Sequence, residues 1–311
     1  MALDHVNVYV IDEGDSWTII DTGFWSKKTQ SIWSDIKEKW FSDKPIGKVI
    51  VTHHHPDHVG LAGWFQTEFK ADLWMSRTAW LMARMLRLDY QKLPTEETIN
   101  FWRRAGMDDL ILNERATGKP FNFGDSVHEM PLGFRRIIDG EKIILGNRSW
   151  IVRVGNGHAP EHLTLWCEDE PIVIAGDQII SSISPNLGVY ATEPDADPVQ
   201  EWLMSCEAFL PFSNDKQLVL PGHKLPFYGL PHRLKQLIEN HHSALKRLVA
   251  FLKEPQTAVD CFPVLFNRKI SDNEYGLALV EAVAHLNHLY RKKIVKRELN
   301  SKGAYVYTLK N

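Results

Sequence analysis

The sequence predicts an α/β protein in which a large first domain is followed by a small second one. Short apolar strands alternate with amphipathic helices over residues 1–230, which is the order expected of sheets covered by outer helices. Over residues 231–311 long helices and a basic ribbon replace this alternation. A chain of 311 residues with 44% hydrophobic residues is large enough to bury both cores.

The elements of the first domain follow from its apolar pattern. The runs that predict strands lie at 5–10, 17–20, 48–51, 152–158, 172–177 and 217–223. A helix is predicted at about 26–41, where Ile32, Ile36 and Trp40 recur at helical spacing, so we expect these three to form its buried face. A second helix is predicted near 60–69.

A histidine-rich run, T-H-H-H-P-D-H-V-G, follows the strand at 48–51. Alternate side chains of an extended segment point the same way, so His53, His55 and Asp57 share one side. His58, at the end of the run, points in a different direction. Imidazole and carboxylate are the ligands that borderline divalent metals prefer. The run therefore predicts a metal site, and the alternative is a histidine-rich surface turn that binds metal only adventitiously.

Three further polar residues repeat this placement later in the chain. His158, Asp177 and His223 each close an apolar strand beside a glycine. Residues at strand ends are held by a rigid scaffold, and such positions often carry chemistry. With the histidine run, at least five metal-binding groups would converge on one spot, which suits two metal ions better than one. This recurrence argues against the surface-turn alternative.

Together with an early D-T-G turn at Asp21–Gly23, these motifs resemble those of the metallo-β-lactamase superfamily of hydrolases. The family's H-x-H-x-D-H motif is matched from His53 to His58, and the resemblance covers about residues 4–230. It implies an αββα sandwich with metals along one edge between the two sheets. Members with a similar pattern carry a small C-terminal winged helix, as β-lactamase-like protein 2 does, and glyoxalase II and lactone hydrolases share the metal set.

The resemblance also implies a role for each motif residue. The ligands would be His53, His55 and His158 for metal 1, Asp57, His58 and His223 for metal 2, and Asp177 as the bridge. Two cations about 3.5–4 Å apart can share a hydroxide and lower its pKa toward neutrality. This bridging hydroxide would attack a carbonyl carbon or a phosphorus atom.

Three other roles follow for residues near these ligands. Asp57 would also accept a proton or orient the nucleophile. Asp21 is expected to hydrogen-bond a ligating imidazole from behind, because such imidazoles usually donate their other N–H to a carboxylate. His54 points away from the ligands on an extended segment, so we expect it to be packed or to lie behind them.

The ligand set contains only nitrogen and oxygen donors, so it favours two zinc ions, with iron or manganese as alternatives. The best-known penicillin-hydrolysing members have cysteine where this chain has Asp177, and Cys167, Cys206 and Cys261 lie outside every motif. Antibiotic hydrolysis is therefore not expected. Three scattered cysteines, no apolar stretch of membrane-spanning length and no signal sequence predict a cytoplasmic protein without a membrane anchor.

The segment at about 76–120 is longer than a simple sandwich needs, and we interpret it as a helical insertion. Helices are predicted at 77–91 and 95–105, followed by a turn at 108–116. Its candidate substrate-pocket residues combine aromatic rings and guanidinium groups: Trp80, Arg84, Arg87 and Trp102. One interpretation is a cap over the metals that holds an acyl chain and an anion. The other is an ordinary helical hairpin with solvated arginines and core tryptophans.

The long loop at 178–198 begins at the predicted bridging ligand, so we expect it to form one wall of the cleft. Tyr190 is its best candidate for donating a hydrogen bond to a substrate oxyanion. The alternative is that Tyr190 packs beneath the loop. Asp195 and Asp197 are predicted to cap the helix near 198–210 rather than bind metal.

The C-terminal segment 231–311 has the pattern of a winged helix. Helices are predicted at 231–253, up to Phe266, and at 272–290, and a two-stranded ribbon at 294–299 and 304–309. Its net charge is +7, whereas the whole chain has −3 and residues 1–230 therefore carry −10. The basic ribbon suggests nucleic acid as one partner. A homodimer contact or a wall beside the site are the alternatives, and we favour these.

Three functions are compatible with this pattern. The favoured one is a dinuclear metal-dependent hydrolase of a small ester, thioester or lactone. The alternative is a metal-dependent phosphodiesterase or endoribonuclease acting on RNA. A third is a non-catalytic binder built on a decayed hydrolase fold, which the complete ligand set disfavours. The apolar, Met- and Trp-rich insertion suits an acyl group better than a ribose-phosphate chain.

Overall fold

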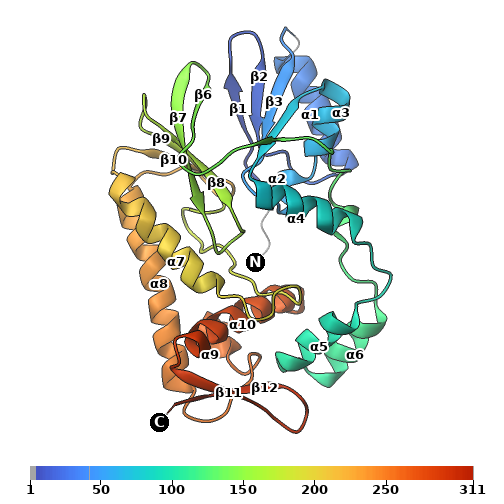
Figure 1. The fold of residues 1–311 in the computed structure, drawn as a ribbon, viewed down its shortest axis with the longest axis vertical. Helices are drawn as coiled ribbons and strands as arrows, with labels where there is room; N and C mark the ends of the chain where they lie inside the picture. The colour runs from blue at the N-terminus through green and yellow to red at the C-terminus, as the bar shows by residue number, and fades with distance from the viewer. Residues whose placement is uncertain (1–4, 42, 311) are drawn as a thin grey trace.

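The computed structural model describes residues 5–41 and 43–310, which form two five-stranded sheets with helices on both outer faces (Figure 1). The first sheet has the order β1-β2-β3-β4-β5, antiparallel between β1 and β2 and parallel elsewhere. Its strands are β1 Tyr9–Asp12, β2 Trp17–Ile20, β3 Ile46–Ile50, β4 Asp72–Met75 and β5 Arg135–Arg136.

The second sheet has the order β10-β9-β8-β7-β6, and in it β9 and β10 are parallel while the other neighbours are antiparallel. Its strands are β6 Lys142–Leu145, β7 Arg148–Gly155, β8 His162–Cys167, β9 Ile172–Gly176 and β10 Leu218–Pro221. The parallel strands of the two sheets matter for function, because their carboxyl ends carry most of the histidine and aspartate motifs.

Three buried apolar clusters hold the layers together. Between the sheets, Ile20 and Ile50 of the first sheet belong to one cluster with Leu163 and Ile174 of the second. The other two clusters lie behind each sheet. The covering helices are α1 Lys27–Trp40 and α3 Ala62–Phe69 on the first sheet, and α7 Pro198–Phe209 and α8 Leu230–Phe251 on the second. The predicted αββα layering is confirmed.

The buried face of α1 differs from the prediction. Trp33 is buried, with its ring 4.9 Å from that of Phe65 and its Nε1 donating to the carbonyl of Thr22. Ile32 and Trp40 are exposed instead, at 46% and 63%. The indole hydrogen bond and the contact with α3 orient the helix, and these are long-range contacts that helical periodicity does not contain.

The first strand is also shorter than predicted. It begins at Tyr9, where pairing with β2 begins, rather than at residue 5. Asn7 instead donates its backbone N–H to the carbonyl of Gly222 and its side-chain amide to that of Pro221. Residues 5–8 therefore run beside the end of β10, next to one of the predicted metal ligands.

The insertion contains three helices, α4 Arg77–Leu88, α5 Glu96–Arg104 and α6 Asp109–Thr117. The turn predicted at 108–116 is wrong, because Asp108 caps a helix there by accepting the N–H of Leu110. Phe101, Met107 and Leu112 of this part belong to the same buried cluster as the C-terminal helices. The second half of the insertion is therefore packed onto the C-terminal part of the chain.

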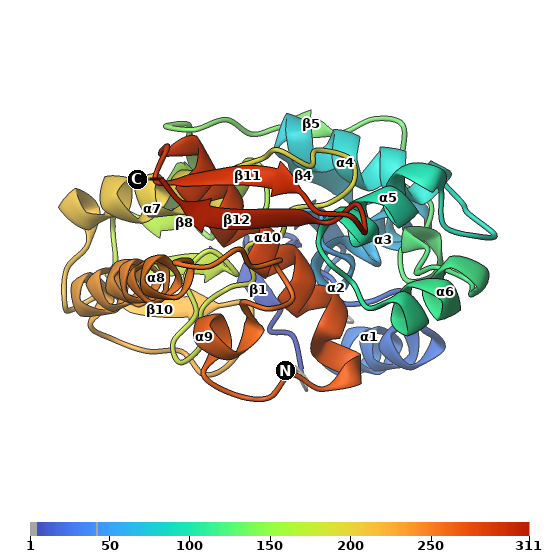
Figure 2. The same cartoon turned by 90° about the horizontal axis from the view of Figure 1, so that it is seen from below.

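The C-terminal part follows α8 with α9 Phe262–Phe266, α10 Tyr275–Arg291 and the ribbon β11 Val295–Leu299 with β12 Tyr305–Leu309. Seen from below, the ribbon lies beside α5 (Figure 2), and Arg104 of α5 donates to the carbonyl of Gly303 at 3.0 Å. Among the described residues, no helix is both long and apolar enough to cross a membrane.

Candidate metal centre

The predicted metal ligands meet at one edge of the sandwich, where both sheets end near α2 Pro56–Val59 (Figure 1). The histidine run follows β3, Asp177 follows β9 and His223 follows β10, while His158 lies in the connection from β7 to β8. Parallel neighbours end at the same sheet edge, so two ligands from β9 and β10 face those from β3. The topology of the two sheets therefore brings motifs that are far apart in the sequence together in one site.

Three groups of candidate ligand atoms form within this edge, and two of them share no residue, whereas the third, His53, His58 and Asp177, joins these two. His53, His55 and His158 offer ring nitrogens that all lie within 4.8 Å of one another. A second group with the same spacing consists of Asp57, His58 and His223. In it, His223 Nε2 lies 3.1 Å from the carboxylate of Asp57.

Asp177 lies between the two groups. One of its carboxylate oxygens, Oδ2, is 3.6 Å from Nε2 of His158 in the first group. The same oxygen is 3.5 Å from Nε2 of His58 and 3.4 Å from Nε2 of His223 in the second. Its other oxygen, Oδ1, is buried and has no hydrogen-bond partner. A single carboxylate therefore faces imidazoles of both groups.

The rear nitrogens of these imidazoles are occupied by the protein. His58 Nδ1 is 2.8 Å from the carboxylate of Asp21, His158 Nδ1 is 2.9 Å from the carbonyl of Asn186, and His223 Nδ1 is 2.6 Å from that of His5. A carbonyl or an ionised carboxylate can only accept, so Nδ1 carries a proton and Nε2 is the nitrogen that points forward.

The forward nitrogens form no hydrogen bond with the protein. Nε2 of His58, His158 and His223 is in each case buried and faces a carboxylate oxygen at 3.1–3.6 Å, without the geometry of a hydrogen bond. Buried polar atoms normally have partners, so three imidazole nitrogens gathered around one carboxylate without a hydrogen bond indicate a missing group. Nitrogen and carboxylate donors in this number fit a divalent cation.

Asp21 supports the site from behind. Its two carboxylate oxygens accept the backbone N–H and the hydroxyl of Thr52, each at 2.8 Å, in addition to facing His58. Its backbone is left-handed, with φ 61°, a conformation that aspartate tolerates better than most residues. The D-T-G turn thus presents a carboxylate to the back of a candidate ligand.

The electrostatics of the cluster suit ligation. Burial, with a smaller effect of neighbouring imidazoles, holds the pKa of His53 and His55 well below the ordinary value, so both are neutral. Burial also lowers the pKa of His58, but the charges of Asp177 and Asp21 outweigh it and the pKa is raised.

The bridging candidate is ionised in the same environment. Burial raises the pKa of Asp177, yet the neighbouring His58 and His223 outweigh it, and the carboxyl pKa is held well below its usual range. Metal ligation needs a carboxylate in its ionised form and imidazoles with a free lone pair. A cation would take the place of the protons that hold His58 and His223 against the carboxylates.

His162 belongs to this site and was not predicted. It is fully buried, and its ring stacks on that of His53 with centroids 4.4 Å apart. Its Nε2 accepts the backbone N–H of Asp177 at 3.1 Å. Its position, four residues after His158, was the only signal in the sequence, and the pairing of β8 with β9 is what brings it behind two candidate ligands.

Two glycines beside the ligands are required by close packing. A Cβ on Gly222 would lie 2.3 Å from Oδ1 of Asp177, and one on Gly176 would lie 2.6 Å from the ring of His162. The P-G-H and A-G-D sequences at the strand ends therefore reflect lack of space. His54, in turn, is buried beside the ring of His55, and its Nδ1 has no partner.

The candidate pocket residues of α4 contact the protein itself. Trp80 stacks on Phe134 and donates to the carbonyl of Pro131, and Arg84 donates to that of Met130. Arg87 packs against Gly124 in the short helix η1 Phe123–Asp125. Their assignment to a substrate pocket stays a prediction.

Trp102 and Asp195 lie on the C-terminal side of the molecule. Trp102 of α5 is partly buried against the C-terminal cluster, and its assignment to a substrate pocket also stays a prediction. Asp197 caps α7 as predicted, by accepting the N–H of Gln200. Asp195 does not cap it; it accepts hydrogen bonds from Arg291 and Arg297.

Tyr190 lies in the loop after β9, and its side chain is 50% exposed. Burial nevertheless raises the pKa of its hydroxyl. One side of the ring is covered by Gly188, where a Cβ would lie 2.9 Å from the Tyr190 side chain, and the rest stays open. This position is compatible with contact to a bound molecule.

Known proteins share both parts of the chain. Residues 1–223 match the model of the metallo-beta-lactamase superfamily, and residues 245–310 match that of the metallo-beta-lactamase-like, C-terminal domain. A curated relative, the "Probable metallo-hydrolase YqjP" of Bacillus subtilis, is 23% identical over 99% of this chain and 95% of its own.

Two crystal structures cover nearly the whole chain. A beta-lactamase domain protein from Burkholderia ambifaria is 30% identical, with a TM-score of 0.91 over 100% of this chain and 90% of that one. A metallo-beta-lactamase family protein from Thermus thermophilus is 25% identical, with a TM-score of 0.75 over 98% of this chain and 94% of that one. The chain therefore belongs to the metallo-β-lactamase superfamily and is a metal-dependent hydrolase with a metallo-β-lactamase-like C-terminal domain.

Proposed function

We propose that this protein is a dinuclear hydrolase that cleaves a small ester, thioester or lactone. The observation that carries the proposal is the set of three buried Nε2 atoms, on His58, His158 and His223, that form no hydrogen bond and surround the carboxylate of Asp177. One carboxylate between two ligand groups is the arrangement that a pair of cations requires.

In this proposal each group of ligand atoms holds one divalent ion, zinc in preference to iron or manganese. The ligands are His53, His55 and His158 for the first ion, Asp57, His58 and His223 for the second, and Asp177 for both. When bound, two such metal ions would supply an activated water and polarise the oxygen of the carbonyl group under attack.

The chain's own residues orient the reaction. Burial raises the pKa of Asp57, but the nearby His58 and His223 outweigh it and keep the carboxyl ionised. An ionised carboxylate at this edge can accept a proton from the attacking water. Tyr190, half exposed in the adjoining loop, can donate its hydroxyl hydrogen to the oxygen that becomes negative.

The insertion supports an acyl substrate. Leu81, Met85 and Leu88 form an apolar stripe on α4 and are exposed at 51%, 46% and 71%. An exposed apolar stripe on one helix is typical of a surface that meets an apolar partner group. On the ribbon side, the exposed Arg291 donates to the backbone carbonyl of Asp195, and Arg297 pairs with the Asp195 carboxylate, so part of the basic charge is already paired within the protein.

The test is a substrate panel on protein loaded separately with zinc, iron or manganese. Thioesters, lactones, aryl esters, bis-aryl phosphates and single-stranded RNA would be compared at equal metal content. We expect turnover of carboxylic esters, thioesters or lactones that chelation abolishes and metal restores. Metal-dependent cleavage of RNA without ester turnover would overturn the proposal in favour of the nuclease.

A further inference from the structure

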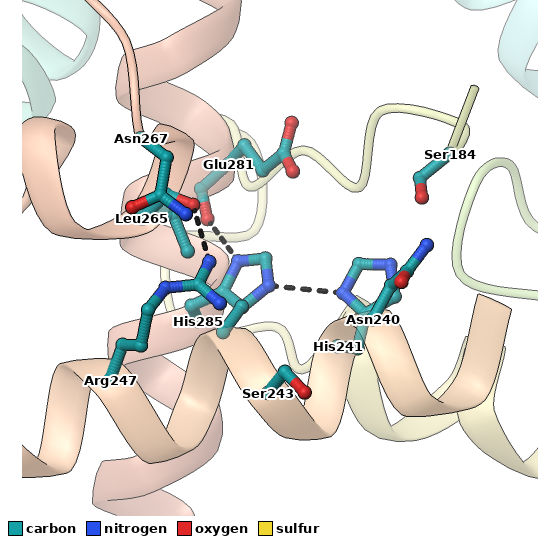
Figure 3. Close-up of a pocket in the computed structure, with 10 residues that line it drawn as sticks. Ser184, Asn240, His241, Ser243, Arg247, Leu265, Asn267, Glu281 and His285 are labelled. Atoms are coloured by element: carbon teal, nitrogen blue, oxygen red, sulfur yellow. Dashed lines mark hydrogen bonds between the residues drawn. The ribbon is translucent and has the colours of Figure 1, made fainter. Parts of the chain in front are cut away.

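A cavity of about 320 Å³ lies outside the metal centre, between α8, α9 and α10, with the loop at Ser184 on one side (Figure 3). Its wall is largely polar and includes His241, Arg247, Glu281 and His285. The proposed hydrolysis uses none of these side chains. The cavity is therefore a candidate for a second binding site.

The protonation of the two histidines in this wall follows from their neighbours. His285 Nδ1 lies 2.8 Å from the backbone carbonyl of Glu281, which can only accept, so Nδ1 carries the proton. Burial lowers the pKa of His285 to about 4 and that of His241 to about 3, so both rings are neutral at neutral pH. His285 Nε2 is then an acceptor, and His241 Nδ1, 3.0 Å away, donates to it.

This chain of hydrogen bonds leaves His241 Nε2 as an acceptor in need of a donor. The atom is buried, and no protein group among the described residues hydrogen-bonds to it. An unsatisfied buried acceptor is costly, and a donor that enters the cavity would remove this cost. A hydroxyl or N–H group on a ligand would supply that donor.

Arg247 is a hydrogen-bond donor with a free position, whereas His241 is an acceptor. Its Nε and Nη2 donate to the carbonyls of Val264 and Leu265, each at 3.0 Å. Its Nη1 has no acceptor among the residues that the structure describes, and no carboxylate forms an ion pair with the guanidinium there. Figure 3 shows Arg247, His285 and His241 in a row along α8 and α10. A cation thus lines the cavity without a counter-ion.

The acidic residue in the wall does not neutralise this cation. The Glu281 carboxylate accepts the side-chain amide of Asn186 at 2.7 Å. Burial raises the pKa of Glu281 to about 7, so the group is partly protonated at neutral pH. A partly protonated carboxyl repels an anion on Arg247 less than a fully ionised carboxylate would.

We propose that the cavity binds a small hydroxycarboxylate, whose carboxylate pairs with Arg247 and whose hydroxyl donates to His241 Nε2. Arginine binds carboxylates and phosphates alike, and the partly ionised Glu281 in the same wall repels a singly charged carboxylate less than a doubly charged phosphate. The backbone positions of His241 and Arg247 are six residues apart on α8, about 9 Å along its axis. We therefore choose a ligand whose hydroxyl and carboxylate are separated by several carbon atoms.

The cavity is connected to the metal centre by two hydrogen bonds. Glu281 accepts from the Asn186 side chain, and the Asn186 carbonyl accepts from Nδ1 of the candidate ligand His158, at 2.9 Å. Hydroxycarboxylates are the products of lactone hydrolysis. That the bound molecule is a product acting on its own enzyme rests on the proposed function, whereas the binding site itself does not.

Calorimetric titration of the full-length, metal-loaded protein with ω-hydroxyhexanoate tests the site without measuring hydrolysis. We expect one site per chain. Hexanoate lacks the donor for His241 and hexanediol lacks the anion for Arg247, so both should bind at least about tenfold more weakly. Binding should persist after chelation, because the cavity contains no metal ligand. Loss of binding on chelation would place the carboxylate at the metal centre and overturn the proposal.

Variants on one helix provide the matched comparison. His241→Phe should weaken ω-hydroxyhexanoate binding about tenfold or more, whereas His242→Phe alters an exposed neighbour and should bind like the wild type. Arg247→Gln should abolish binding, with thermal unfolding measured alongside because Arg247 also holds two backbone carbonyls. If that variant does not fold, the His241 and His242 pair decides. Equal affinity in His241→Phe, or equal affinity for hexanoate, would overturn the assignment.

Discussion

Two sets of buried histidines in this protein differ in what faces them. In the metal centre, carboxylates lie against the imidazoles, and the nearby Asp177 and Asp57 raise the pKa of His223 to about 9 although burial lowers it. In the C-terminal part, His241 and His285 face each other and a backbone carbonyl, and their pKa values fall to about 3 and 4. Equal burial thus gives a cation site in one place and a neutral hydrogen-bonding site in the other.

The largest effect is expected from removing the carboxylate that distinguishes the metal centre. Asp177→Ala should reduce bound metal from about two ions per chain to fewer than one, because both ligand groups contact this residue. Turnover should fall about 10²–10³-fold or more. Metal analysis and ester hydrolysis measure this, with exposed Asp215→Ala as the control. Full occupancy of both sites in Asp177→Ala would contradict the bridging role.

A smaller effect is expected behind the same ligands. Asp21→Ala removes the carboxylate that orients His58, and such changes typically cost about 10–100-fold in metal affinity. Competition with a metal chelator measures the affinity. Asp35→Ala, on the exposed side of α1, is the control. An unchanged affinity in Asp21→Ala would show that Thr52 and the backbone alone hold this turn.

The third prediction concerns the pair of neutral histidines in the C-terminal part. The pKa values of His241 and His285 are lower in the folded than in the unfolded chain. The unfolded chain therefore takes up protons first, and the free energy of unfolding falls as pH is lowered from about 6.5 toward 4. At about pH 5 the lowered pKa of each histidine reduces the free energy of unfolding by about 2 kcal/mol. The double variant His241→Phe, His285→Phe should therefore lose stability less steeply in acid. Denaturant titration of chelated protein at several pH values measures this, and parallel curves would refute it.

Tyr190→Phe should have a modest effect on catalysis. It removes a hydroxyl that we place beside the developing oxyanion, so kcat should fall about tenfold with little change in KM or metal content. Steady-state kinetics with an aryl ester, together with metal analysis, separates these quantities. An unchanged kcat would show that Tyr190 only packs in its loop.

The smallest effect is expected at the exposed lysines beside the ribbon. Replacing Lys292, Lys293 and Lys296 with Ala should leave ester turnover nearly unchanged, because none of them contacts the metal edge. RNA binding should be weak in both proteins and nearly independent of these residues. Tight RNA binding whose steep salt dependence flattens in the variant would instead assign the ribbon to nucleic acid.

Much of the candidate site could be predicted because its motifs are local. The histidine run, the D-T-G turn and the strand-end glycines each depend on a few consecutive residues, and the structure brings His53, His58, Asp177 and the others to one edge. His162 and Asn186 could not be predicted. Their roles depend on the pairing of β8 with β9 and on the loop that reaches His158, which are contacts between distant segments.

The sequence by itself determined the alternation of strands and helices and the candidate ligand motifs, which are local properties of the chain, and the resemblance carried by those motifs implied the αββα class. Only the tertiary structure decided which face of α1 is buried, that α5 and α6 pack on the C-terminal part, and that His241 keeps an acceptor without a donor. The physical reason is the same in each case. Burial and hydrogen-bond satisfaction depend on neighbours brought together by long-range packing, and no local pattern contains them.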